Sequence, residues 1–307
     1  MVSSDSRMIH RLADRPMTGA RAIRAAAAFA FLLWAGSAAA LRPRPMVELQ
    51  PGTARPGDVV LITVRGEKAP LSGQVGDKTL VFVRSARGFR ALFGIPVERP
   101  PGEMSLQIQL PEGAGTQDGG EIALSVDIVE PGFPSRELQV SNQYINPPPK
   151  AKRWMAQDQA AFRRAYDQPL TGLLFRQGFA WPRDPLVTSH FGDLRLFNGQ
   201  KQSQHFGTDL DGRVGDPVAA ANDGVVVLAR ACYASGNTVI IHHGGGLFTA
   251  YFHLSRMQVN PGMKVVRGQR IGLVGKTGRV TGPHLHWASK VNSLYVNAES
   301  LLQLRFD

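Results

Sequence analysis

Five polar residues in one stretch of the chain together have the side chains that a catalytic zinc site uses. They are His205 and Asp209 in HFGTD, His253 in YFHLS, and His284 and His286 in PHLHW. Zinc accepts imidazole nitrogen and carboxylate oxygen, and a catalytic zinc has three protein ligands and an open position for water. Two histidines and one aspartate meet that count. A zinc ion lowers the pKa of a bound water toward about 7 and polarises a carbonyl group, so the residues indicate amide hydrolysis.

The local sequence predicts how the chain presents these residues. A Gly-Pro turn before HLHW indicates a strand, in which residues two apart share one face at roughly 7 Å, so His284 and His286 point into one cavity. In a straight strand His205 and Asp209 would lie about 13 Å apart, which is too far for two ligands of one metal. Gly207 between them argues against a helix, and we therefore expect a bend or loop there.

The same segments resemble the lysostaphin-type, or LytM-type, zinc metalloendopeptidases, which cut the peptide part of peptidoglycan. The resemblance covers roughly residues 187–302 and comprises TSHFG, HFGTD, GDPVAAANDGVVV, YFHLS, VVRGQRIGLVGKTG and GPHLHW. HxxxD and HxH are each weak motifs alone, but both in this order, with HLS and glycine-rich strands between them, are a strong signature. The resemblance implies that His205, Asp209 and His286 bind one zinc ion per chain, and that His253 and His284 are the unligated catalytic pair.

The chain departs from the usual family pattern at several positions. Phe206 follows the first ligand, where a small residue is more common, so the shape of the groove near the metal is expected to differ. His242 stands where the family more often has aspartate, and His190 in TSHFG is also unusual. With His243, these two histidines are the rival metal ligands. We expect His243 to be a turn residue at a strand end and the other two to be partly exposed.

Residues 1–40 have the layout of a secretory signal peptide. A short apolar stretch, AAAAFAFLLWAGSAAA, ends in small residues and follows two arginines, and we expect cleavage after Ala40. The stretch is shorter than the about 20 apolar residues that span a bilayer, which disfavours the alternative of a retained anchor. The residue directly after the expected cleavage site is Leu41 and not a cysteine, so a lipoprotein is excluded. The sequence therefore predicts a periplasmic or secreted protein of the cell envelope, with either Met1 or Met17 as its true start.

Composition and charge agree with an exported globular protein. The chain has 307 residues, of which 43% are hydrophobic, and one cysteine, Cys232, which cannot form an internal disulfide. The net charge is +11; residues 1–40 hold five arginines and two aspartates, or +3, which leaves +8 on the mature chain. A basic protein is held near the anionic polymers of a bacterial envelope. Nucleic acid is not expected as a partner, because the basic residues are dispersed and no nucleic-acid-binding motif is present.

The chain is predicted to be all-β with two domains. Residues 45–146 show seven short strands, VELQ, DVVLITVR, KTLVFVRS, FRALFGIPV, MSLQIQL, EIALSVDIV and RELQV, which predict a β-sandwich. This region resembles the immunoglobulin-like domains that precede the peptidase in some relatives, and a spacer is its default role. Residues 181–307 are strand-rich again and predict a mostly antiparallel, barrel-like sandwich with an open groove, which is the peptidase domain.

Residues 147–180 connect the two predicted domains. They begin with Pro147-Pro148-Pro149, a stiff spacer, and continue as AKRWMAQDQAAFRRAYDQP, whose periodicity predicts an amphipathic helix that Pro169 ends. The helix is interpreted as a brace between the domains. A plug over the catalytic groove is the alternative, and the sequence does not decide between them.

Three functions from different classes are candidates for this sequence. The first is an exported zinc metalloendopeptidase that hydrolyses peptide cross-links of peptidoglycan, with cell-division or wall-synthesis proteins as further partners. The second is a metal-free LytM-type activator of a separate cell-wall amidase, but such domains lack ligands and here all five polar positions are present. The third, a lipoyl-type carrier, has no HxxxD and HLH set. The bond that is cut, D-alanyl to diaminopimelate or glycyl, and the oligomeric state stay open.

Overall fold

The computed structural model describes residues 44–86, 88–112, 120–139, 146–199 and 201–306. The expected signal peptide, residues 1–40, therefore lies outside the described part of the chain. Within the described ranges no helix combines the length and the apolar character that a membrane crossing requires.

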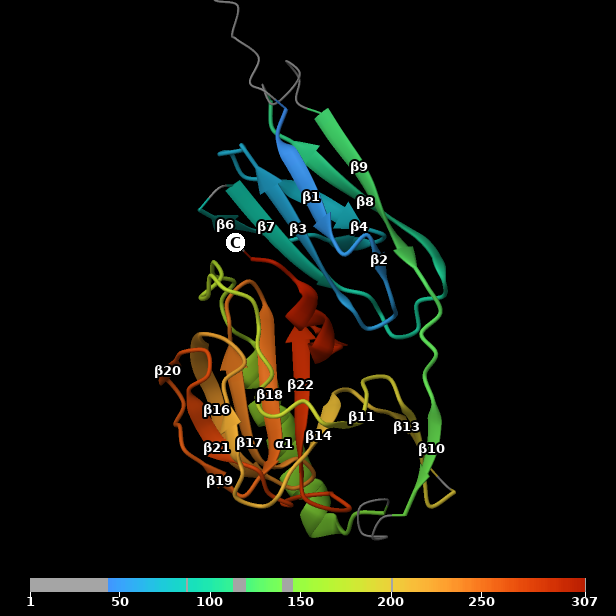
Figure 1. Ribbon diagram of the computed structural model, residues 1–307, viewed down its shortest axis with the longest axis vertical. Helices are drawn as coiled ribbons and strands as arrows, with labels where there is room; N and C mark the ends of the chain where they lie inside the picture. The colour runs from blue at the N-terminus through green and yellow to red at the C-terminus, as the bar shows by residue number, and fades with distance from the viewer. Residues whose placement is uncertain (1–43, 87, 113–119, 140–145, 200, 307) are drawn as a thin grey trace, which may run out of the picture. The chain divides into compact units, whose positions relative to one another are not determined.

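Two sheets form the first part of the described chain (Figure 1). One has the order β1-β3-β7-β6 and the other β2-β9-β8-β4-β5. The core between them holds one apolar face of each sheet; in β8, for example, Leu106, Ile108 and Leu110 are buried while the glutamines between them are exposed. The strands are β1 (Met46–Gln50), β2 (Thr53–Ala54), β3 (Val59–Arg65), β4 (Ser72–Val75), β5 (Lys78–Thr79), β6 (Phe82–Ser85), β7 (Gly88–Gly94), β8 (Gly102–Leu110) and β9 (Gly120–Ile128).

The strand that follows belongs to a different sheet from the one expected. The segment RELQV was counted as the seventh strand of the sandwich, but β10 (Ser135–Leu138) pairs in parallel with β12 (Leu194–Phe197), which in turn pairs with β13 (Lys201–Gln204). The expectation for this strand was wrong because its alternating pattern indicates a half-buried strand without indicating its partner.

The largest sheet carries the residues of interest. In the described chain it has eight strands, in the order β11-β14-β22-β18-β17-β16-β20 with β23 beside β22, and its strand pairs are antiparallel. Its strands are β11 (Val187–Ser189), β14 (Thr208–Asp211), β16 (Gly224–Cys232), β17 (Gly236–His242), β18 (Leu247–Leu254), β20 (Lys264–Val265), β22 (His284–Val291) and β23 (Leu294–Val296). The all-β prediction is confirmed, but the end strands β11 and β20 of the described sheet do not pair with each other, so it is no closed barrel.

Both faces of the large sheet pack against other elements. One face, with Leu285 and Trp287 of β22, packs in a core that includes residues of a small sheet, β15 (Pro217–Ala219), β21 (Arg270–Leu273) and β19 (Arg256–Met257), and of the short 3-10 helix η2 (Ala298–Gln303). The opposite face, with Phe248 and Ala288, packs against α1 (Pro149–Tyr166), the helix that the sequence predicted (Figure 1). Asp158 of α1 forms an ion pair with Arg230 of β16, with 2.8 Å between Oδ1 and Nη2.

His243, which follows β17, is fully buried in this fold. Its Nδ1 lies 2.7 Å from the carbonyl oxygen of Asp223, and its Nε2 lies 2.7 Å from the hydroxyl of Thr249. Burial lowers the pKa of His243 from 6.5 to about 4, because the charged imidazolium would lose its hydration. The neutral ring therefore serves as a structural hydrogen-bonding group.

Because His243 is buried, the free energy of unfolding is expected to decrease as the pH is lowered. The unfolded chain binds a proton at His243 below pH 6.5 and the folded chain does so only below about pH 4, so the free energy of unfolding decreases as pH falls through that window. At about 1.4 kcal/mol per pH unit the loss is roughly 2–3 kcal/mol by pH 4.5. Urea unfolding of the parent and of His243→Gln is to be measured at pH 7.5 and at pH 4.5. The free energy of unfolding of the parent, relative to that of the variant, should be lower at pH 4.5 than at pH 7.5. A difference that is the same at both pH values would contradict this account.

Candidate metal centre

The register between β14 and β22 brings two of the predicted ligands together. Asp209 lies directly opposite His286 in this antiparallel pair, and their side chains are on the same face. The Oδ1 atom of Asp209 is 2.7 Å from the Nδ1 atom of His286. The predicted strand at HLHW is thus present, and His284 shares the face of His286 two residues away.

His205 reaches the same place from the turn before β14. Residues 205–207 are outside the strand, so the predicted bend is present. The Nε2 atom of His205 lies 3.1 Å from Asp209 Oδ1 and 2.9 Å from His286 Nδ1. Its Nδ1–H donates to the carbonyl oxygen of His190 at 2.8 Å, which fixes the ring so that Nε2 faces the other two residues. A Cβ atom at Gly207 would overlap the His286 ring, and this close approach requires glycine.

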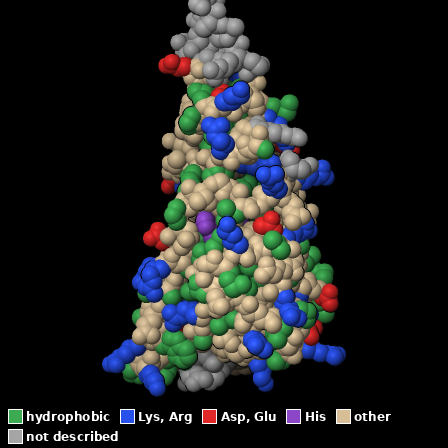
Figure 2. All heavy atoms as spheres, turned by 90° about the vertical axis from the view of Figure 1, so that its left-hand side faces the viewer, with side chains coloured by type: hydrophobic (Ala, Val, Ile, Leu, Met, Phe, Trp, Pro, Cys, Tyr) green, Lys and Arg blue, Asp and Glu red, His purple; other side chains and the backbone are tan. Residues whose placement is uncertain are grey.

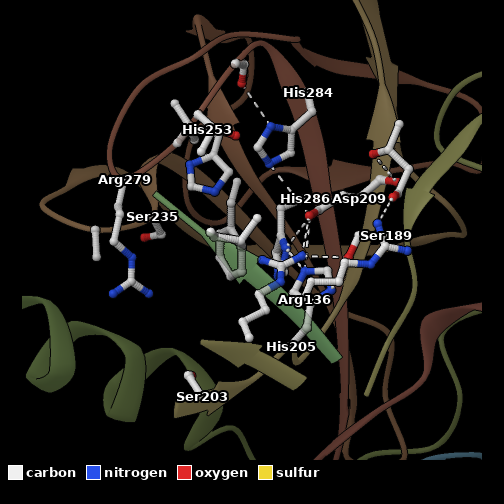
Figure 3. Close-up of a pocket in the computed structure, with 18 of the residues that line it drawn as sticks. Arg136, Ser189, Ser203, His205, Asp209, Ser235, His253, Arg279, His284 and His286 are labelled. Atoms are coloured by element: carbon white, nitrogen blue, oxygen red, sulfur yellow. Dashed lines mark hydrogen bonds and ion pairs between the residues drawn. The ribbon is translucent and has the colours of Figure 1, made fainter. Parts of the chain in front are cut away.

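The donor set fits a metal ion. Two imidazole nitrogens and one carboxylate oxygen, from His205, His286 and Asp209, converge within 4.8 Å of one another (Figure 3). Donor atoms around a tetrahedral zinc with bonds of about 2.1 Å are roughly 3.4 Å apart, so these side chains need only small outward movements to hold zinc.

The two other predicted histidines face the same donors. His284 Nε2 is 3.7 Å from Asp209 Oδ1, and the ring centres of His253 and His284 are 5.0 Å apart. Each of the two rings has its Nδ1 held by a backbone carbonyl, His253 by Thr277 at 2.8 Å and His284 by Gly282 at 2.9 Å. A carbonyl can only accept, so in the neutral rings Nδ1 carries the proton and Nε2 has the lone pair.

His253 reaches the site through an irregularity in β18. Its φ is 63°, a left-handed value that is uncommon for a residue with a side chain, and the register of β17 against β18 shifts at this point. The ring of Phe252, the preceding residue, stacks on His286 with centres 5.2 Å apart, while that of His253 is 6.1 Å from His286. A β-bulge thus turns two consecutive side chains towards one ring, which regular alternation would not do.

Burial and charge determine the protonation of the centre. Burial alone would raise the pKa of the Asp209 carboxyl, but its hydrogen bonds with His205 and His286 hold the pKa well below its usual range. Burial lowers the pKa of His286 to about 4, and burial together with the neighbouring histidines lowers the pKa of His253 to about 3. The carboxylate is therefore charged and these two imidazoles are neutral at pH 7, which are the forms that bind a divalent cation or accept a proton.

A half-buried arginine behind Asp209, Arg195, belongs to none of the sequence motifs. Arg195 Nη2 donates to Asp209 Oδ2 at 2.7 Å and to the hydroxyl of Ser189 at 2.8 Å. Oδ2 is thereby occupied and Oδ1 is left facing the histidines. Ser189 lies in the motif TSHFG and Arg195 six residues later, but neither spacing nor residue type alone indicates that they support a metal ligand.

A groove of about 550 Å³ opens over the five residues. Its lining includes His205, Asp209, His253, His284 and His286, and none of it comes from α1. In the described structure α1 packs on the large sheet and does not enter the groove, which argues against the plug.

Phe206 gives the groove an aromatic wall beside the metal centre. It lines the groove, is 39% exposed, and contacts the rings of Phe191 and Tyr295 at centre distances of 6.0 and 5.7 Å.

The rival histidines lie elsewhere. His190 is exposed and contacts Glu299 at 2.9 Å, while His243 is buried as described above. His242 was expected to be partly exposed, and this was wrong: it is buried and stacks on Phe248 with ring centres 4.6 Å apart, because α1 covers that face of the sheet. The side chains of these three do not line the groove, and Cys232 is buried outside it.

Comparison with known proteins shows similarity over part of the chain. Residues 203–298 match the model of Peptidase family M23. Peptidoglycan DD-endopeptidase ShyA of Vibrio cholerae is 49% identical over 113 residues, 36% of this chain and 26% of that protein; ShyC of the same organism is 42% identical over 142 residues, 44% of this chain and 32% of that protein. The matches thus span less than a third of either relative. A crystal structure of an M23 peptidase from Pseudomonas aeruginosa is 27% identical with a TM-score of 0.60, covering 81% of this chain and 94% of that one.

The contact between Gly207 and His286 generates a prediction. Gly207→Ala places a methyl group where the His286 ring lies, so the ring must move away from Asp209 and the affinity for zinc should fall about 10-fold or more. Competition with a chromophoric chelator measures this affinity. Gly52→Ala is the control, because a Cβ atom there meets nothing within 4 Å. Equal zinc affinity in the two variants would contradict the predicted displacement.

Proposed function

We propose that this chain, whose residues 203–298 form a domain of peptidase family M23, is a zinc metalloendopeptidase that hydrolyses peptide cross-links of peptidoglycan. The observation that carries the proposal is the convergence of three donor atoms in a groove that two further histidines also line. One zinc ion per chain, bound by His205, Asp209 and His286, would polarise the scissile carbonyl and make a water acidic enough to attack it near neutral pH.

The two unligated histidines have complementary roles in this proposal. His284 has its Nε2 lone pair on the side of Asp209, so it is the general base that takes a proton from the attacking water. The resulting imidazolium then donates a proton to the leaving amine. His253 keeps its neutral Nε2 as an acceptor, because Thr277 holds its Nδ1–H, and it orients the water. A ring nitrogen without a proton cannot donate to an oxyanion, so we prefer orientation of the water as the role of His253. The alternative is that His253 is the general base and His284 orients the water.

The proposed substrate follows from the named relatives. ShyA and ShyC are peptidoglycan DD-endopeptidases, and they are 49% and 42% identical to this chain over 113 and 142 residues. We therefore assign the D-alanyl to diaminopimelate cross-link as the bond that is cut, in preference to a glycyl bridge.

An envelope location completes the proposal. Residues 1–40 direct export and are removed, and residues 45–146, apart from β10, which pairs with β12, form the immunoglobulin-like spacer. Residues 147–180 connect it to the peptidase domain, and that domain extends over residues 181–307. The excess of basic residues favours the anionic wall; Figure 2 shows Lys and Arg side chains spread over one face among fewer acidic ones. Cell-division or wall-synthesis proteins are the further partners that this location offers.

Removal of one ligand tests the metal assignment. Asp209→Ala and His286→Ala each leave two donors, so both variants should purify without zinc and fail to convert cross-linked muropeptides into monomers. His190→Ala is the control, since the substitution keeps the carbonyl oxygen that contacts His205 and removes only an exposed ring that contacts Glu299 outside the groove. Elemental analysis that finds one zinc ion per chain in either ligand variant would refute the assignment.

Removal of an unligated histidine tests the catalytic roles. His253→Ala and His284→Ala should keep zinc and the parent fold but lose about 100-fold or more in turnover, which is the usual contribution of a positioned acid, base or donor. Zinc content, circular dichroism and muropeptide release are measured on the same preparations. A variant that cleaves at the parent rate, or that loses its metal, would show that the role proposed for that residue is wrong.

A further inference from the structure

Strand β10, which precedes the linker helix, is hydrogen-bonded along the whole of β12. Arg136 lies beside Arg195 in this parallel pair. The backbone also connects the strands at both ends, since Leu194 N–H donates to Pro134 and Asn198 N–H donates to Leu138, at 2.8 and 2.9 Å. Both Arg136 and Leu138 line the catalytic groove. A segment that reads as part of the upstream sandwich thus forms one wall of the site.

Arg136 pairs with a carboxylate that has no access to water. Its Nε lies 3.1 Å from Oδ2 of Asp193, whose side chain is 0% exposed, and its Nη1 donates to the carbonyl oxygen of Thr188 at 3.2 Å. The Ser189 hydroxyl donates to the same Oδ2 at 2.7 Å. An ionised carboxylate at such a site requires a paired cation, so loss of Arg136 would leave an uncompensated buried charge.

The interactions continue from Asp193 to the metal ligands. Ser189 accepts from Arg195, and Arg195 holds Asp209, as described above. The backbone of the same loop holds His205: its N–H donates to the carbonyl oxygen of Asp193 at 2.9 Å, and its carbonyl oxygen accepts from Gly192 at 2.8 Å. The loop of residues 189–193 therefore orients His205 through the backbone and Asp209 through Arg195. The charge of Asp193 in that loop is neutralised by Arg136 of β10. Figure 3 shows Arg136 and Ser189 close to this group of donors.

We propose that Arg136 is a positioning residue of the metal centre. Strand β10 then belongs functionally to the peptidase and not to the spacer. Arg136 neutralises Asp193, this keeps Ser189 and the loop in place, and the loop holds Asp209 and His205 in the geometry that binds zinc. The inference rests on the proposed metal site and adds to it a contribution from outside the segment that matches the family model.

Zinc affinity of the full chain tests this role directly. Arg136→Gln should weaken zinc binding about 10-fold or more, which is the usual effect of losing an outer partner of a metal ligand. Arg136→Lys, which keeps the charge but cannot bond Asp193 and Thr188 together, should give an intermediate value. Arg279→Gln is the matched control, because Arg279 also lines the groove but its guanidinium lies over the ring of Phe197.

A double variant covers the case in which Arg136→Gln does not fold. Arg136→Gln with Asp193→Asn removes both charges, so it should fold and bind zinc more tightly than Arg136→Gln alone, and within a few-fold of the parent. Affinity in Arg136→Gln within twofold of the parent, or a raised KM as its only defect, would overturn the inference and leave the proposed function intact. A double variant that folds but binds zinc no better than a folded Arg136→Gln, or that does not fold, would also overturn it. Absence of zinc binding in the parent would overturn both proposals.

Discussion

The structure depends on one carboxylate that is kept ionised among imidazole rings in a buried position. Asp209 is 7% exposed, and its two oxygens have different partners: Oδ1 faces His205 and His286, and Oδ2 accepts from Arg195. Burial disfavours the charge, but the interactions with His205 and His286 more than compensate, so the pKa of Asp209 lies well below its ordinary range. Because Arg195 occupies Oδ2, Oδ1 is the oxygen that faces the ring nitrogens of His205 and His286, and these three atoms form a donor set that suits a divalent cation.

The apolar core determines where this carboxylate points. Leu210 and Leu285 are fully buried on the face of the sheet opposite to Asp209 and His286. Because side chains alternate along a strand, a slip of β14 by one residue would put Asp209 into the core and Leu210 into the groove. Burial of the leucines thus stabilises the register that aligns the proposed ligands Asp209 and His286. Apolar packing on one face of the sheet offsets the free-energy cost of gathering polar groups on the other.

Local sequence signals predicted the parts of the site that depend on neighbours along the chain. The alternation of HLHW placed His284 and His286 on one face, and Gly207 marked the bend that lets His205 and Asp209 converge. Long-range contacts determine the rest. The bulge at His253 depends on the pairing of β17 with β18, which no spacing within YFHLS encodes.

The same limit explains the other differences between expectation and structure. The pattern of β10 indicates a strand, but its partner is β12, more than fifty residues away along the chain, and not the sandwich. Arg195 has no motif of its own, and it acts through the fold that brings it to Asp209. His242 is buried because α1 covers its strand, whereas the amphipathic pattern of that helix indicated an apolar face but not its target.

Activity measured against added zinc tests the central claim most directly. The purified chain, stripped by a chelator, should leave cross-linked peptidoglycan intact, and stepwise addition of zinc should restore cleavage in proportion until one ion per chain is bound. Mass spectrometry of the products should show dimeric muropeptides converted into monomers by hydrolysis of the D-alanyl to diaminopimelate bond. Cleavage by the stripped chain, or a chain that binds one zinc ion and leaves the dimers unchanged, would contradict the account.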